Sequence, residues 1–234
     1  MLDSNNSTVT SIKIVWPIVF CGGAIGLILS WLVLSGDQQG RVNLFYLLLV
    51  YLVIPLLSVV ASLASLLFGK GINLARLLSS IPLWSFQSKT LIRKIQQLNL
   101  DKYWFLLQSQ AAAIAFSLAS MVTFFTLLIA TDLNFVWRST ILEATDILPM
   151  LEIIAKPWYF WTTAQPNLLL LELTQDSRIA DINSGFRGYG SWWQFILATQ
   201  LYYSFLLRIL VILLTRWWLI RSMSSDIEQL LLKQ

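Results

Sequence analysis

The chain has 234 residues, of which 57% are hydrophobic and only 12% are charged. A soluble domain carries about 25% charged residues, so this composition excludes a water-soluble globular domain and indicates an integral membrane protein. The net charge of +4 would suggest nucleic acid binding in a soluble protein, but in a membrane protein it reflects topology, and no nucleic acid partner is expected.

Four apolar segments reach the length of about 20 residues that a helix needs to cross a hydrocarbon core of about 30 Å. They run from 15 to 34, from 43 to 68, from 103 to 130 and from 193 to 214. The sequence therefore predicts an all-α integral membrane protein with four transmembrane helices. Its parts are a cytoplasmic N-terminus (1–14), a transmembrane hairpin (15–69), a basic cytoplasmic loop (70–102), the third transmembrane helix (103–130), an extracytoplasmic helical cap (131–192), the fourth transmembrane helix (193–216) and a cytoplasmic tail (217–234).

The charges beside the spans predict the orientation, because cytoplasmic loops retain Lys and Arg. The segment 70–102 holds six Lys or Arg and one Asp, a net charge of +5, whereas the segment 131–192 holds four basic and seven acidic residues, a net charge of −3. The basic loop is therefore expected inside and the acidic segment outside. With an even number of spans, both termini are expected in the cytoplasm.

The first span carries small residues at intervals of four, namely Gly22, Gly26 and Ser30. In lipid, close approach of two backbones is a main source of helix affinity, so these residues predict a packing seam. The seam serves either the packing of the four helices within one chain or contact between copies in a homo-oligomer. In the second span, Pro55 removes one backbone hydrogen bond and is expected to kink the helix, a defect that Ser58 can partly repair.

The basic loop contains an amphipathic stretch, KTLIRKIQQLNL at residues 89–100. Its cations Lys89, Arg93 and Lys94 lie apart from its apolar face, which is typical of a helix on the inner leaflet with its cations near anionic headgroups. The alternative is a docking surface for an acidic partner protein.

The segment 131–192 is too long for a simple loop, and it is expected to contain short helices over residues 139–156 and 166–175. Its aromatic stretch PWYFW (157–161) favours the headgroup level, which predicts a cap on the outer membrane surface. Asp132 and Arg138 are expected to form an ion pair at the outer end of the third span.

Arg208 interrupts the apolar run LYYSFLLRILVILL (201–214) near the predicted midplane. An arginine at that depth costs about 2.5 to 3.5 kcal/mol on insertion scales, so it should face protein or water. Gln108 and Gln110 of the third span are the predicted acceptors, at a matching height above the inner interface. A cation held only by neutral acceptors keeps its positive potential, so three roles remain open: a structural contact, a pore or anion site, and lipid binding.

Catalytic and metal-binding patterns are missing from the sequence. Histidine is absent and Cys21 is the single cysteine, which excludes internal disulfides, zinc clusters and Cys-His or Ser-His pairs. Gly69-Lys70 lacks the upstream glycine of a P-loop. Glu143 and Asp146 share a helical face, but a solvated acidic surface explains them better than a calcium site. No enzyme activity, metal or cofactor is expected.

Four stretches resemble a bacterial membrane family, the domain of unknown function 2868 (DUF2868). They are GRVNLFYLLLVYLVIPLLS (40–58), DLNFVWRSTIL (132–142), KPWYFWTTAQPNLLLLELTQDSR (156–178) and SWWQFILATQLYYSFLLR (191–208). The last span of that family carries a Tyr-Gly-x-x-Pro-Arg pattern. Here Tyr203 and Arg208 match it, whereas Ser204 and Leu207 replace the glycine and the proline.

The resemblance implies a multi-pass protein of the bacterial inner (plasma) membrane. Members are commonly encoded beside a P-loop GTPase-like protein, which implies such a protein as a cytoplasmic partner. The expected function is a non-enzymatic membrane subunit that anchors or senses this partner. The alternative is a homo-oligomeric channel or pore lined by polar residues that include Arg208 and Gln110.

Overall fold

A computed structural model describes residues 14–67, 101–176 and 188–214. Within these ranges the fold is mostly helical. Four helical segments are long and apolar enough to cross a membrane, namely Trp16–Leu34, Leu44–Ala64, Leu106–Ala130 and Gly190–Leu214. They follow the four predicted spans closely, because length and hydropathy along the chain suffice to define such helices.

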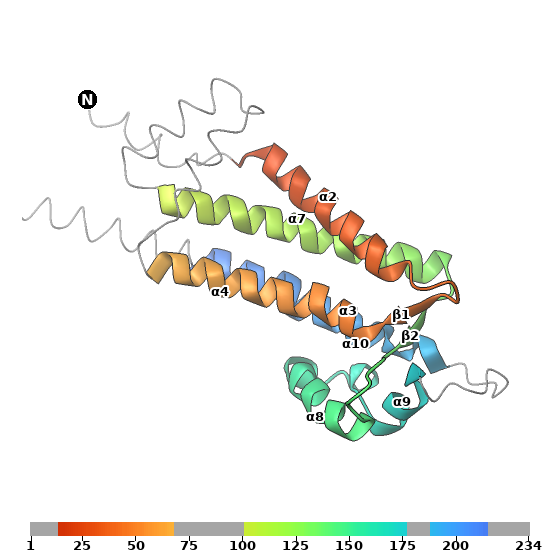
Figure 1. Cartoon of the computed structure of the whole chain (residues 1–234). Helices are drawn as coiled ribbons and strands as arrows, with labels where there is room; N and C mark the ends of the chain where they lie inside the picture. Colours follow the sequence, from red (N-terminus) through yellow and green to blue (C-terminus); the bar gives the residue numbers. More distant parts are fainter. Residues whose placement is uncertain (1–13, 68–100, 177–187, 215–234) are drawn as a thin grey trace, which may run out of the picture.

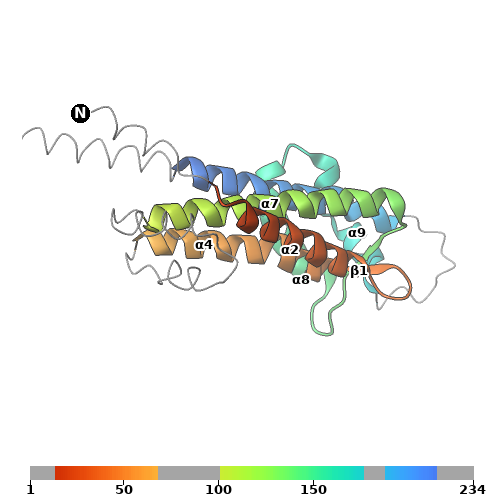
Figure 2. The same ribbon diagram turned by 90° about the horizontal axis from the view of Figure 1, so that it is seen from above.

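The first span is the helix α2 (Trp16–Leu34), and the third is the long helix α7 (Asp101–Ala130). These two helices run side by side along their length in both views (Figures 1 and 2). Pro17 occupies the first turn of α2, where a missing N–H is tolerated. The backbone N–H of Val15, just before the helix, donates to Gln108 Oε1 at 2.9 Å, so α7 supplies the cap of α2.

The second span consists of α3 (Leu44–Leu48), a π-helical turn η1 (Leu49–Val53) and α4 (Ile54–Leu67). In η1 the N–H of Ile54 bonds to the carbonyl of Leu49, one residue further back than in an α-helix. The turn ends just before Pro55, which has no N–H for the regular ladder. The expected defect therefore takes the form of a local widening of the helix.

The fourth span begins with a 3₁₀ segment η5 (Gly188–Trp192) and continues as α10 (Trp193–Thr199), the π-helical η6 (Gln200–Leu206) and a further α-helical run to Leu214. The two π-helical segments η1 and η6 contact each other, and η6 also contacts α7. The widened turns therefore meet where the second, third and fourth spans come together.

Two short strands depart from the all-α prediction. β1 (Arg41–Asn43) and β2 (Asn134–Val136) pair in parallel, with Val42 opposite Phe135. Parallel strands need a crossover connection, which the second and third spans provide here together with the chain between them. The pair lies at one end of the four helices, hereafter the sheet end (Figure 1).

The segment 131–192, hereafter the connecting segment, contains the helices α8 (Ala144–Ala155) and α9 (Leu168–Leu173) with the 3₁₀ turns η2 (Lys156–Trp158) and η3 (Thr162–Ala164) between them. Its core consists of Trp137, Trp158 and Trp192, each fully buried, with indole N–H groups that donate to the Leu171 carbonyl, the Ala164 carbonyl and Thr174 Oγ1. The expected helices are present, but α8 lies beside the spans near α10 and not beyond their ends (Figure 1).

Candidate functional site

Arg208 is buried at the contact of three spans, with 3% of its surface exposed. One terminal nitrogen, Nη2, donates to Ser58 Oγ at 2.7 Å and to the Pro55 carbonyl at 3.0 Å. The other, Nη1, donates to Gln110 Oε1 at 3.3 Å. The second and third spans thus supply the acceptors of this side chain. An arginine buried among transmembrane helices needs such polar partners.

The acceptors form a chain of their own. Gln110 Nε2 donates to Ser62 Oγ at 3.0 Å, and Ser62 Oγ donates to the Ser58 carbonyl at 2.7 Å. In the part of the chain that the structure describes, Arg208 forms no ion pair, and its Nε has no hydrogen-bond partner. The guanidinium is therefore held by neutral oxygens alone, and its positive charge is not cancelled by a neighbouring carboxylate.

The residues beside Arg208 on the fourth span tie it to the rest of the fold. The hydroxyl of Ser117 on α7 donates to the Ser204 carbonyl at 2.8 Å and lies 2.8 Å from Ser204 Oγ. The hydroxyl of Tyr203 donates to the Ile154 carbonyl at 3.0 Å, at the end of α8. Of the residues that occupy the pattern noted in the sequence, Tyr203 therefore contacts the end of α8, Ser204 contacts α7, and Arg208 contacts both α7 and the second span.

Of the two glutamines predicted as acceptors, the structure brings only Gln110 to Arg208. Gln108 lies on another face of α7, where its Oε1 accepts from the Val15 N–H. The two residues lie about 200° apart around an α-helix, so they cannot both face the fourth span.

Gly22 and Gly26 lie against α7 within the same chain. A Cβ atom at Gly22 would stand 2.3 Å from the Ala112 carbonyl oxygen, and one at Gly26 would stand 2.4 Å from that of Phe116. Only glycine permits so close an approach. Ser30 is fully buried on the same helix. The seam therefore contacts the backbone at Ala112 and Phe116, whereas Gly23, at 3.9 Å from Ala115, has ordinary contact.

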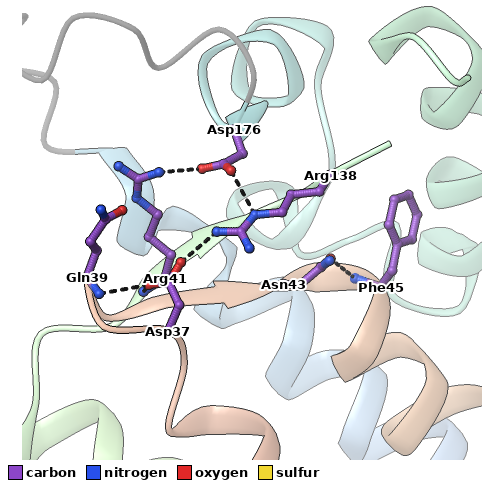
Figure 3. Close-up of polar contacts among 7 residues, drawn as sticks. All are labelled: Asp37, Gln39, Arg41, Asn43, Phe45, Arg138 and Asp176. Atoms are coloured by element: carbon purple, nitrogen blue, oxygen red, sulfur yellow. Dashed lines mark hydrogen bonds and ion pairs between the residues drawn. The ribbon is translucent and has the colours of Figure 1, made fainter. Parts of the chain in front are cut away.

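A four-residue ion cluster at the sheet end was not predicted. Arg138 pairs with Asp37 at 2.6 Å and with Asp176 at 2.7 Å, and Arg41 pairs with Asp176 at 2.7 Å (Figure 3). The expected pair of Asp132 with Arg138 is wrong, because the parallel strands bring the loop before β1 beside the end of β2. Asp37 and Arg41 lie in the polar stretch SGDQQGR (35–41), about 100 residues or more before Arg138 and Asp176, so local spacing in the sequence gave no signal for the cluster.

Asp37 holds the loop between α2 and β1 through hydrogen bonds to its backbone. Its carboxylate accepts from the backbone N–H groups of Gln39 and Arg41 at 2.9 and 3.0 Å (Figure 3). The Arg41 N–H, followed by the Arg138 guanidinium, lowers the pKa of Asp37 from 3.8 to about 2. The hydrogen bond that the Arg138 guanidinium donates to the Asp37 carboxylate raises the pKa of Arg138. Asp37 and Arg138 therefore stay ionised at neutral pH. The ion pairs of the cluster join three distant stretches of the chain.

Lys89, Arg93 and Lys94 lie outside the described residues. In the described ranges no group of three Asp, Glu, Cys or His side chains is placed to hold a metal ion. The acidic pair Glu143 and Asp146 instead closes the start of α8, where the Glu143 N–H donates to Asp146 Oδ2 at 3.0 Å.

Four helices are long and apolar enough to cross a membrane, and three of them meet at a buried arginine with neutral acceptors. This arrangement indicates a helical membrane protein. The chain belongs to the family described as Protein of unknown function (DUF2868), whose model matches residues 74–227. This range includes the third and fourth spans, the connecting segment and Arg208, and the first two spans lie outside it. No curated protein and no solved structure matches the chain.

Proposed function

We propose that this protein is a non-enzymatic, multi-pass subunit of the bacterial inner membrane that anchors or senses a cytoplasmic GTPase-like partner. In this proposal both termini and the basic loop face the cytoplasm, and the sheet end with the connecting segment faces outward. The positive charge of the loop supports this orientation, since Lys and Arg are retained on the inner side.

The observation that carries the proposal is that Arg208 forms its hydrogen bonds with other helices of its own chain. Three hydrogen bonds tie its guanidinium to the second and third spans, and 3% of the residue remains exposed. An arginine that served a conduit would need contact with water or a passing anion. The geometry instead supports a helix bundle in which Arg208 fastens the fourth span to its neighbours.

The proposed recognition surface is the basic stretch that carries Lys89, Arg93 and Lys94. A cationic, amphipathic stretch attracts an acidic protein surface as well as anionic headgroups. It lies between the second and third spans in the sequence, so the bundle would hold the partner at the membrane. The GTPase-like class of the partner is taken from the family resemblance.

The test is co-purification from native membranes with a tagged chain, in the presence of a non-hydrolysable GTP analogue. We expect a P-loop protein to be recovered with the wild type and lost from a variant that carries Lys89→Glu, Arg93→Glu and Lys94→Glu. The matched control, Lys89→Arg, Arg93→Lys and Lys94→Arg, keeps every charge and should retain the partner. Recovery of no such protein, or equal recovery with the charge-reversed variant, would overturn the proposal.

A homo-oligomeric channel is the second candidate, favoured by the absence of a carboxylate partner for Arg208 among the described residues. An uncompensated cation inside the membrane attracts anions. Planar-bilayer recordings decide this point. Anion conductance that falls in Arg208→Leu would support the channel, and a silent wild type would dispose of it.

Orientation is tested separately by cysteine labelling in a Cys21→Ser background. A membrane-impermeant maleimide should modify Glu143→Cys in intact cells and Lys94→Cys only after lysis. The reverse pattern would invert the topology on which the proposal depends.

A further inference from the structure

The exposed face of α8 carries both apolar and charged side chains, although the end of this helix lies beside the middle of the fourth span. The Tyr203 hydroxyl donates to the Ile154 carbonyl, and the ring of Trp158 packs on those of Tyr202 and Tyr203 at 5.3 and 5.9 Å. Tyr203 lies about 15 Å along the helix from Trp193, near the middle of the part of the span that ends at Leu214. The end of α8 therefore lies beside the middle of the fourth span.

This surface is poorly suited to direct contact with lipid chains. Ile153, Tyr159 and Phe160 are 62%, 78% and 66% exposed, as an apolar environment would favour. Glu152 on α8 and Lys156, the residue that follows the helix, are exposed too, however, and ionised side chains at that depth are costly unless they are paired. The chain after α8 consists of short 3₁₀ turns, and irregular backbone at membrane depth is tolerated where protein or water covers it.

The charge pattern on α8 is complementary to itself. Glu152 and Lys156 are one turn apart and lie on one side of the helix, opposite the buried Ile147, Leu151 and Ala155. Across a two-fold axis, two antiparallel copies of α8 would set Glu152 of each copy against Lys156 of the other, with the exposed aromatic residues packed around them. Such an isologous contact closes at two copies.

We infer that the exposed face formed by α8 and the turns after it, with Glu152, Ile153, Lys156, Tyr159 and Phe160, is the interface of a homodimer within the outer half of the membrane. The inference is independent of the proposed GTPase-like partner. It also differs from a pore-forming ring, because an isologous contact joins two copies only. The Gly22 and Gly26 seam is already occupied by α7 and does not provide this contact.

The test measures particle mass of the full chain in nanodiscs across a dilution series, with size-exclusion profiles as a check on folding. Wild type should be dimeric. Glu152→Lys and Lys156→Glu should each raise the dissociation constant about tenfold or more, because each sets like charges opposite one another. The double variant Glu152→Lys with Lys156→Glu restores opposite charges and should return to near the wild-type constant. Glu172→Lys, an exposed change on α9, is the control.

Cross-linking locates the contact. In a Cys21→Ser background, a short bis-maleimide should join two copies through Ile153→Cys but not through Ile25→Cys, which lies on the exposed face of α2. A wild-type mass of one chain in nanodiscs, a double variant that stays dissociated, or cross-linking at Ile25→Cys alone would overturn the inference. Single variants as dimeric as wild type would do the same.

Discussion

The guanidinium of Arg208 and the hydroxyl of Ser58 lie on different spans and are joined by a hydrogen bond of 2.7 Å. Because Gln110 accepts from the same guanidinium, one side chain of the fourth span holds both the second and the third. The planar guanidinium reaches acceptors on two helices because its two terminal nitrogens point in different directions. The shape of the donor group should therefore matter as much as its charge.

The first prediction compares Arg208→Lys with Arg208→Met. Lysine keeps the charge but offers one compact donor group, so it cannot reach acceptors on two helices, and we expect the free energy of unfolding to fall by about 1–3 kcal/mol. Methionine removes both the charge and its desolvation, and we expect a change of about 1 kcal/mol or a gain in stability. Thermal unfolding in detergent measures both. If Arg208→Lys had the same free energy of unfolding as the wild type, the two-helix contact of the guanidinium would not contribute to stability.

The second prediction concerns the contact of α2 with α7. In Gly26→Ala the new Cβ would stand 2.4 Å from the Phe116 carbonyl oxygen, and because this is backbone the helices must separate. We expect a loss of about 1–3 kcal/mol in stability, as for other overpacked positions. Gly23→Ala on the same helix is the matched control, since its Cβ would meet Ala115 at an ordinary 3.9 Å. Thermal unfolding measures both variants. Equal stabilities would show that the close contact between the backbones of α2 and α7 does not require glycine at position 26.

The third prediction is a pH dependence that originates at Asp37. Its pKa in the folded chain is about 2, against an ordinary value of 3.8, so its contribution to stability is present above pH 4 and is lost as the pH falls from 4 towards 2. Asp37→Asn should lower the melting temperature at pH 6 and flatten its decline between pH 4 and 2. Asp132→Asn is the control, because Asp132 forms no ion pair among the described residues. Wild-type pH dependence in Asp37→Asn would exclude this carboxylate as the origin.

The fourth prediction concerns the attachment of α8. Tyr203→Phe removes the hydrogen bond to the Ile154 carbonyl and keeps the ring against Trp158. We expect a stability loss of about 0.5–1.5 kcal/mol, the range for single hydrogen bonds in membrane proteins, with faster amide exchange over residues 144–158. Tyr202→Phe is the matched control, since only its ring contacts Trp158. Exchange as slow in Tyr203→Phe as in the control would mean that the hydroxyl does not hold α8.

The positions of the four helices followed from the sequence, because a run of about 20 apolar residues has few alternatives to a spanning helix. The need of Arg208 for polar partners followed from its depth. The choice of Gln110 over Gln108 did not, since it depends on the rotation of α7 about its axis. The Pro55 carbonyl could not be predicted as an acceptor either, because every residue carries one and only packing selects among them.

The sequence by itself determined the mostly helical class of this protein, the four segments long and apolar enough to cross a membrane, and the presence of a charge in one of them. All of these depend on composition and local order. The tertiary structure alone decided which groups meet. The pair of Asp37 and Arg138 is 101 residues apart in the chain, and the pair of Arg41 and Asp176 is 135 apart. Parallel pairing of β1 with β2 brings these loops together, and the short polar turns around them carry no apolar period that would fix such long-range contacts in advance.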